Sequence, residues 1–447
     1  MSESKRSISA RVGAVATLAT VALLFVLTQR PSVPAAEAAV LYRLEAEAGQ
    51  KWFKGNLHTH SLWSDGDDYP EMIADWYRRH EYQFLCYTDH NITQDTEKWI
   101  DVEKSKGKRE AYDKLLKRFP VGWVVEREQA GRLEVKLKRF EELYNEFTVP
   151  GEFLLIRGEE ISDRFGKFPV HMNASNIQEM IPPLGGESVY DVMQNNVNAV
   201  IAQRERTGEP IMIHLNHPNF GYAVTAEELM RVRGENFFEV YNGHPGVNNS
   251  GNEQRASAER IWDIILAKRI TELELPIMYG LATDDGHNYH NMPSRASEPG
   301  RGWVMVLAEK LTPDALIAAL EAGQFYSTSG VRLKTVKATA EAYELEVEAE
   351  QGVEYEIQFI GTKKGFDPES KPVLDDKGNE IRTTRRYSDD VGAVLATVKG
   401  TSARYEFSEN DLYVRAKVIS TKKHPNPSEV GEFERAWAQP VLGPAGR

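Results

Sequence analysis

The sequence predicts an α/β fold, a distorted (β/α)7 TIM-like barrel over residues 50–331, followed by an antiparallel β-sandwich-like domain over residues 332–447. Two observations lead to this prediction. In the first region short apolar runs alternate with amphipathic stretches, and strands that alternate with helices are typical of a parallel sheet. After Val331 the helical periodicity ends, and a strict two-residue alternation typical of half-buried strands begins.

Seven apolar runs in the first region are predicted to be strands, and seven strand–helix units favour a barrel. In chain order they are Trp52–Leu57, Phe84–Thr88, Phe153–Arg157, Pro169–Asn173, Ile211–His214, Phe237–Tyr241 and Ile277–Ala282.

The helices are predicted from one-sided apolar spacing and from their end signals. Pro70 at the first turn begins one helix, and Thr225 with Glu228 forms a capping box ahead of another. The full set is Pro70–His80, Ser188–Arg206, the helix after Thr225, Ala258–Lys268 and Pro313–Ala322, the last capped by Thr312 and closed by Gly323.

Residues 94–149 interrupt this alternation and are predicted to be a helical insertion. Leu133–Tyr144 is its best helical stretch, with Leu133, Leu137, Phe140 and Tyr144 on one face. An insertion of this length beside a site is often a lid or specificity element, and a solvated surface hairpin is the alternative. In the C-terminal region, 343–349, 353–359 and 412–418 alternate as strands.

The N-terminal segment 1–39 resembles a targeting sequence. Lys5, Arg6 and Arg11 precede an uncharged, mostly apolar run at 12–27, and small residues follow at 35–39. This order predicts a secretory signal peptide and export to the periplasm or the extracellular space. An uncleaved membrane anchor is the alternative, although the run is short against the ~20 apolar residues of a spanning helix.

The composition excludes several functions. Lys and Arg number 54 against 67 Asp and Glu, for a net charge of −13, and residues 1–38 hold an excess of +2, which leaves −15 for the rest. Non-specific binding of nucleic acid is therefore not expected. The expected partner is a small molecule. Cys86 is the single cysteine, so neither an internal disulfide nor a thiolate zinc cluster can form. The oligomeric state is left open.

Histidines and carboxylates gather at the predicted strand ends. His58 and His60 share one side of the first strand, because residues two apart face the same way. Asp65 follows in the same segment, and further candidates lie after or within the later strands: His90, Glu160, His171, His217, Asp285 and His287. Chemistry collects at the carboxyl ends of barrel strands, and so many unpartnered ionisable groups in one place would be costly without a metal. Imidazole and carboxylate without thiolate suit Zn, Mn or Fe.

These residues fall in motifs that resemble the polymerase and histidinol phosphatase (PHP) superfamily. Asn56–Gly66 with its H-x-H and Ser64-Asp65-Gly66, Tyr87–Asn91, Gly158–Ser162, His171, Asn216–Pro218 and Asp285–His287 occur in the family's order across about residues 52–331. The runs 238–245, 283–287 and 302–303 resemble the branch of carbamate (carbaryl-type) hydrolases.

The resemblance implies a di- or trinuclear site with two to three divalent transition metals. His58, His60, Glu160 and Asp285 would hold the first; Glu160 would bridge to a second, completed by His171 and His217; Asp65, His90 and His287 would hold a third. Asp65 stands where many relatives have histidine. Glu159 and Asp284 adjoin two of these ligands and are expected on the opposite side of their strands or as partners of histidine N–H groups.

The implied activity is that of a metal-dependent phosphoesterase, hydrolysing a small phosphomonoester or phosphodiester with metal-bound hydroxide as the nucleophile. A carbamate or carboxylester hydrolase of the same superfamily and a non-catalytic exported binding protein are the alternatives. Asn242, His244 and Arg301 are weaker candidates for substrate contacts, His214 is a candidate partner of the ligands, and Cys86 is expected in the core.

Overall fold

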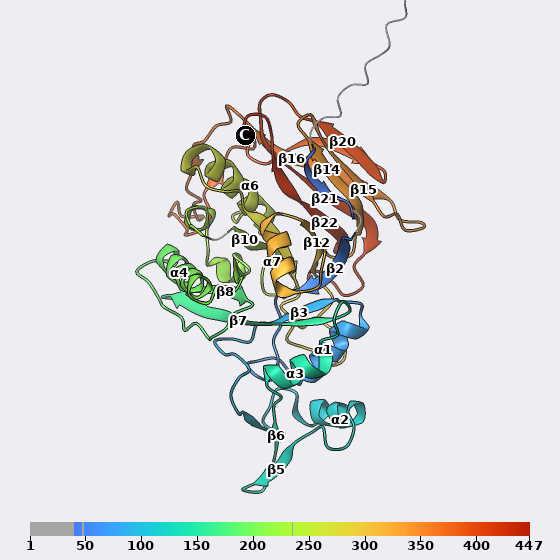
Figure 1. Cartoon of the computed structure of the whole chain (residues 1–447). Helices are drawn as coiled ribbons and strands as arrows, with labels where there is room; N and C mark the ends of the chain where they lie inside the picture. Colours follow the sequence, from blue (N-terminus) through green and yellow to red (C-terminus); the bar gives the residue numbers. More distant parts are fainter. Residues whose placement is uncertain (1–39, 47–48, 235) are drawn as a thin grey trace, which may run out of the picture. The chain divides into compact units, whose positions relative to one another are not determined.

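The computed structural model describes residues 40–46, 49–234 and 236–447, so the predicted signal peptide or anchor at 1–39 lies outside the described residues. Among the described helices, none is both long and apolar enough to cross a membrane. The fold is mixed α/β, with one large sheet, a second four-stranded sheet and several short helices (Figure 1).

The large sheet has 13 strands, and its first seven correspond to the seven predicted strands. Its order is β11 (Tyr279–Thr283), β10 (Phe237–Asn242), β9 (Met212–Leu215), β8 (Phe168–Ser175), β7 (Leu154–Phe165), β3 (Phe84–Tyr87), β2 (Lys51–Asn56), β12 (Trp303–Ala308), β13 (Phe325–Thr328), β22 (Phe433–Leu442), β21 (Asp411–Lys423), β16 (Tyr355–Lys363) and β19 (Ala393–Lys399).

The expectation of an all-parallel sheet is wrong. The pairs β2–β3, β3–β7, β9–β10 and β10–β11 are parallel, but β8 runs antiparallel to both β7 and β9. The reason is that β7 does not end at Arg157: it continues to Phe165 and turns through Gly166, at φ 59°, directly into β8. Glycine adopts this left-handed conformation without steric cost, so a hairpin replaces a crossover helix.

The chain segments that follow β2 and β11 meet at one edge of the sheet. Thr59 forms a parallel bridge with Gly286, the His60 amide donates to the Gly286 carbonyl at 3.0 Å, and the Asp285 amide donates to the His58 carbonyl at 3.1 Å. These contacts join the first and last of the seven strands at that edge. A barrel closed along its whole length stays a prediction.

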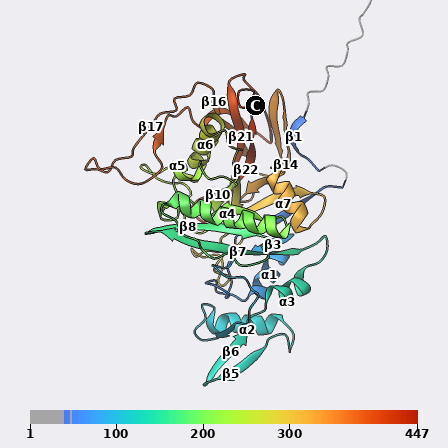
Figure 2. The ribbon, with the colours of Figure 1, turned by 60° about the vertical axis from the view of Figure 1, so that its left-hand side comes forward.

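The predicted helices occur as α1 (Pro70–Arg79), α4 (Val189–Thr207), α5 (Ala226–Leu229), α6 (Ala258–Lys268) and α7 (Pro313–Glu321). Short turns at Phe220–Tyr222 and Arg269–Leu273 follow β9 and α6. Helix α4 covers one face of the β7–β8 hairpin (Figure 2), where Ile161 and Met172 are buried with Val192. The opposite face of the hairpin carries polar residues, Glu160 and Ser162 among them.

The insertion at 94–149 is not purely helical. It contains α2 (Lys108–Arg118), α3 (Phe140–Phe147) and a three-stranded sheet of β4 (Trp99–Asp101), β6 (Arg132–Lys136) and β5 (Glu126–Gln129). The predicted helix Leu133–Tyr144 is therefore wrong in its first half. Leu133, Val135 and Leu137 also fit a strand, and Ala130 and Gly131, both at positive φ, form the tight turn that pairs β5 with β6.

The C-terminal region forms the predicted strands β15 (Ala342–Val347), β16 and β21. The second sheet has the order β1 (Val40–Leu44), β14 (Leu333–Thr339), β15 and β20 (Ser402–Glu406), and a two-stranded ribbon joins β17 (Ser370–Lys371) to β18 (Arg386–Tyr387). Because β22 pairs with β13, the boundary at residue 331 does not separate two sheets. An independent sandwich domain stays a prediction.

Candidate metal centre

All nine predicted metal ligands lie together at the edge where the segments after β2 and β11 meet. They form four overlapping groups whose ligand atoms lie within 4.8 Å of one another. The groups are His60, Asp65, His90 and His287; His58, His217 and Asp285; His58, His60 and Glu160; and His90, Glu160 and His171.

The two histidines of the H-x-H motif form the innermost part of the cluster. Their Nε2 atoms lie 3.1 Å apart, and both approach Asp285 Oδ1, at 3.2 Å from His58 and 3.1 Å from His60. Both imidazoles are fully buried. The backbone bonds between 58–60 and 285–286 place these three side chains, which are distant in sequence, in one space.

Glu160 lies at the centre of the cluster and contacts histidines on both sides. Oε1 lies 3.0 Å from His171 Nδ1, and Oε2 lies 2.9 Å from His90 Nδ1. Oε2 also lies 3.3 Å from His60 Nε2 and 3.5 Å from His58 Nε2. This geometry suits a carboxylate that bridges two cations.

Asp65, His90 and His287 form the outer rim. Asp65 Oδ1 lies 3.3 Å from His90 Nε2 and 3.2 Å from His287 Nε2. The Asp65 side chain is 42% exposed, against 1% for Glu160. Lys106 of the insertion approaches the other carboxylate oxygen of Asp65 at 3.3 Å, so the insertion borders this rim.

The position of His217 differs in detail from the implied ligand set. Its Nε2 lies 3.6 Å from Glu160 Oε1 and 3.9 Å from Asp285 Oδ2, and it groups with His58 and Asp285. His171 groups instead with His90 and Glu160. Which ligands share a cation therefore stays a prediction, although the nine donors converge.

Four buried atoms of the cluster lack a hydrogen-bond partner: His60 Nδ1, Asp65 Oδ1, Glu160 Oε2 and Asp285 Oδ1. Leaving such atoms unpaired in a protein interior is costly. Divalent cations would satisfy them, and imidazole with carboxylate is the donor set of Zn, Mn and Fe sites. The residues present therefore fit the implied metals.

The charges of the cluster shift its pKa values. Burial by itself would raise the pKa of Glu160, but the adjacent His90 and His171 hold it well below its usual range. Burial, together with the nearby charges of His287 and His90, lowers the pKa of His60 to about 4. A neutral His60 and an ionised Glu160 can bind a metal directly, whereas the adjacent Glu160 and Asp65 raise the pKa of His90 to about 11 against the effect of burial, so a metal would have to displace its proton.

Glu239 is a functional residue that sequence reasoning missed. Its buried carboxylate accepts from the His217 amide and Asn242 Nδ2, each at 2.8 Å, and from Thr283 Oγ1 at 2.8 Å. Oε1 also lies 2.7 Å from His58 Nδ1. A hydrogen bond at Nδ1 fixes the ring and leaves Nε2 facing the cluster. The sequence signals are a charged residue inside the mostly apolar strand Phe237–Asn242 and its place in the run 238–245.

Further polar side chains orient the other ligands. Asn216 Nδ2 donates to Glu160 Oε1 at 2.9 Å, and Ser162 Oγ lies 2.5 Å from His90 Nδ1. Asn242, predicted as a substrate contact, is fully buried and donates to Asp285 Oδ2 at 3.1 Å. Asn242 therefore holds a ligand.

The choice between adjacent carboxylates follows from strand geometry. Glu159 points to the α4 side of β7 and accepts from the Ile181 amide at 2.6 Å, and burial raises its pKa to about 8. Asp284 accepts from the amides of Arg301 and Gly302, at 2.6 and 2.9 Å. The structure thus places Glu160 and Asp285 in the cluster, while their neighbours bind backbone amides rather than histidines. Asp285 lies at φ 50°, a strained value for a non-glycine residue.

The remaining candidates have different surroundings. The His244 ring lies 5.8 Å from the His287 ring and is partly exposed beside the rim. Arg301 is fully buried and donates to the Gly243 carbonyl and to Asn426, so it does not face a substrate.

His214 Nε2 lies 3.5 Å from Glu239 Oε1. Cys86 is buried, as expected, and burial raises the pKa of its thiol to about 12.

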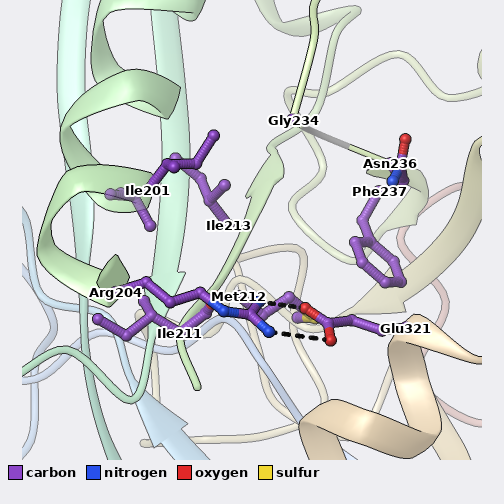
Figure 3. A pocket seen from close by; sticks show the side chains of 10 residues that line it. Ile201, Arg204, Ile211, Met212, Ile213, Gly234, Asn236, Phe237 and Glu321 are labelled. Atoms are coloured by element: carbon purple, nitrogen blue, oxygen red, sulfur yellow. Dashed lines mark hydrogen bonds and ion pairs between the residues drawn. The ribbon is translucent and has the colours of Figure 1, made fainter. Parts of the chain in front are cut away.

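A small cavity of about 170 Å³ lies away from the cluster (Figure 3). Figure 3 shows the Arg204–Glu321 ion pair along one side, with Ile201, Ile213 and Phe237 around the cavity. Its lining residues Met212 and Phe237 begin β9 and β10, whereas the cluster lies after the other ends of these strands. It therefore takes no part in the metal centre.

The chain matches no protein-family model and no curated protein. It is similar to a two-domain protein of Bacteroides vulgatus described as containing a predicted PHP-like metal-dependent phosphoesterase (13% identity, 91% of this chain, 99% of that chain, TM-score 0.38). It is also similar to a proposed metal-dependent phosphoesterase of Bifidobacterium adolescentis (13%, 52% and 87%, TM-score 0.29) and to an amidohydrolase of Chromobacterium violaceum (12%, 61% and 96%, TM-score 0.28).

Two of these neighbours are described as metal-dependent phosphoesterases, one of them as PHP-like. The carbamate-hydrolase branch is not among the descriptions of these neighbours and stays a prediction. Because the TM-scores are low, we infer function from the site itself.

Proposed function

We propose that the chain is a metal-dependent hydrolase of the PHP type that cleaves a small phosphomonoester or phosphodiester. The observation that carries this proposal is the convergence of six histidines and three carboxylates, four of whose buried atoms lie among the other donors without a hydrogen bond. A structural histidine cluster would satisfy its polar atoms internally, because unpaired buried groups are costly.

Divalent cations bound here would supply positive charge to the phosphoryl oxygens and lower the pKa of a water molecule enough for attack near neutral pH. The His58, His60, Glu160 and Asp285 side chains would hold the inner cation. Asp65 and His90 are the most exposed donors and, with the adjacent His287, would meet the substrate side.

The chain's own residues prepare this centre before substrate arrives. Glu239 fixes the His58 ring through Nδ1, and Ser162 does the same for His90. Asn216 and Asn242 hold Glu160 and Asp285 through hydrogen bonds. His244, beside His287, is partly exposed and could contact a leaving group.

Turnover by the metal-loaded full-length chain tests this proposal. p-Nitrophenyl phosphate, bis-p-nitrophenyl phosphate, p-nitrophenyl acetate and an aryl carbamate are compared after loading with Zn²⁺, Mn²⁺ or Fe²⁺. We expect cleavage of a phosphate ester that stops on chelation and is lost in Glu160→Gln. Activity confined to the carbamate or the acetate would overturn the phosphoesterase assignment, and full activity after chelation would reject the metal mechanism.

A further inference from the structure

The β7–β8 hairpin extends the metal cluster into a second cavity of about 560 Å³. His171 and Ser162 form the inner wall of this cavity, and both contact the cluster, through Glu160 and His90 respectively. Arg164, Lys167 and Pro169 line its outer part. The cavity therefore begins at the metal centre and ends among cationic side chains.

The strand register explains why these side chains share one face. Ser162 pairs with His171 and Arg164 pairs with Pro169, and directly paired residues lie on the same side of a sheet. Glu160, Ser162 and Arg164 also alternate along β7 and so point the same way. Helix α4 covers the other face (Figure 2), where Ile161 and Met172 are buried.

The two cationic groups are not paired within the described part of the chain. No hydrogen bond or ion pair there holds the Arg164 guanidinium or the Lys167 ammonium, and Lys167 Nζ lies 5.5 Å from the Phe168 ring. Asp163 also lines the cavity, but its carboxylate accepts from the Gly185 amide, Asn196 Nδ2 and the Arg164 amide. The cavity thus presents two free positive charges on a chain whose net charge is −13.

We propose that this cavity binds a second anionic group of the substrate, a carboxylate or phosphate remote from the ester that is cleaved. The inference rests on the proposed function, because the scissile group must lie at the cluster. Four residues of extended strand separate Glu160 from Arg164, which corresponds to about 13 Å between their Cα atoms. The substrate class is therefore an elongated phosphoester with negative charge at both ends.

Binding of inert phosphonates to the metal-loaded full-length chain tests this subsite by calorimetry. Phosphonooctanoate carries a phosphonate and a carboxylate at opposite ends of an eight-carbon chain, and octylphosphonate lacks the carboxylate. We expect phosphonooctanoate to bind about five- to tenfold more tightly, because two partly exposed charged contacts contribute. The ratio should fall as ionic strength rises.

Variants of the hairpin decide the origin of that preference. Arg164→Gln combined with Lys167→Gln should bring the ratio of the two dissociation constants close to one, whereas Arg164→Lys should keep most of it. Lys399→Gln, which removes an exposed charge from β19, is the control and should leave the ratio unchanged.

A ratio near one in the unchanged chain, no binding of phosphonooctanoate, or a preference that survives the double substitution would overturn the subsite. The hydrolase proposal is decided separately. Turnover of aryl phosphates without any preference for the doubly anionic probe would reject only the subsite, and the preference without turnover would reject only the reaction.

Discussion

The Glu239 carboxylate of β10 lies 2.7 Å from Nδ1 of His58, a fully buried predicted ligand, and holds its ring on the side away from the cluster. Glu239 also fixes the His217 amide and Asn242. One buried carboxylate therefore sets the positions of two predicted ligands and of the asparagine that holds a third. Such partners of metal-binding histidines contribute strongly to metal affinity.

Glu239→Gln should weaken metal binding about 10- to 100-fold, because the amide cannot accept from His58 and its other donors as a carboxylate does. Chelator competition with the apo chain measures this effect. Glu159→Gln is the matched control: it removes a buried carboxylate from the α4 side of β7 and should change the affinity little. Equal losses in both variants would show a general effect on folding.

Glu160→Gln should reduce both metal content and hydrolysis far more than Asp65→Ala, by about 100-fold or more in turnover. The reason is that Glu160 contacts His58, His60, His90 and His171, whereas Asp65 is a half-exposed rim residue. Elemental analysis and steady-state kinetics measure the two effects. If both variants lost activity mildly and equally, Glu160 could not be the central ligand.

Metal loading should raise the unfolding temperature, because cations bind the folded cluster and satisfy its unpaired atoms. We expect two to three equivalents of Zn, Mn or Fe in the purified chain, and a fall in unfolding temperature after chelation. Fewer than one equivalent, with no uptake on reconstitution, would contradict the metal centre.

Glu71 should make stability depend on pH. Burial raises the pKa of this carboxyl to about 7 in the folded chain, against 4.5 for an ordinary glutamate. At a pH between these two values, the folded state therefore keeps a proton that the unfolded state has lost. The free energy of unfolding consequently falls as pH rises from about 4.5 to 7, by at most about 3 kcal/mol. In Glu71→Gln this contribution should be absent, as measured by the difference between the free energies of unfolding in urea at pH 5 and at pH 7.5. Glu146→Gln, on the exposed side of α3, should keep the wild-type pH dependence.

Arg415 in β21 connects the C-terminal strands to α6 through a buried ion pair. Its Nε and Nη2 atoms donate to the two oxygens of Asp263, at 2.8 and 2.7 Å. Arg415→Ala should cost about 3–5 kcal/mol, because the buried Asp263 carboxylate is left unpaired. The double variant Asp263→Leu with Arg415→Met should be less destabilised than Arg415→Ala in denaturant unfolding. A larger loss in the double variant would show that packing dominates here.

Local sequence patterns determined many of the helices and strands of this protein and its donor atoms. The apolar runs around Phe84 and Phe237, the capping box at Thr225 and the Pro70 helix start all occur as predicted, because these features depend on neighbouring residues. His58 and His60 also face the same space as predicted, since the side of a strand on which they face follows from their spacing alone.

Tertiary structure alone decided the direction of β8, the partner of β22 and the residues that hold the ligands. These depend on contacts between distant segments, such as the Gly166 turn that leads β7 into β8 and the pairing of β13 with β22. The local sequence does not reveal the role of Glu239, because its carboxylate can hold His58, 181 residues away, only when folding brings the two together. Short-range propensity does not determine such contacts between distant residues, whereas the packing of the whole chain determines them.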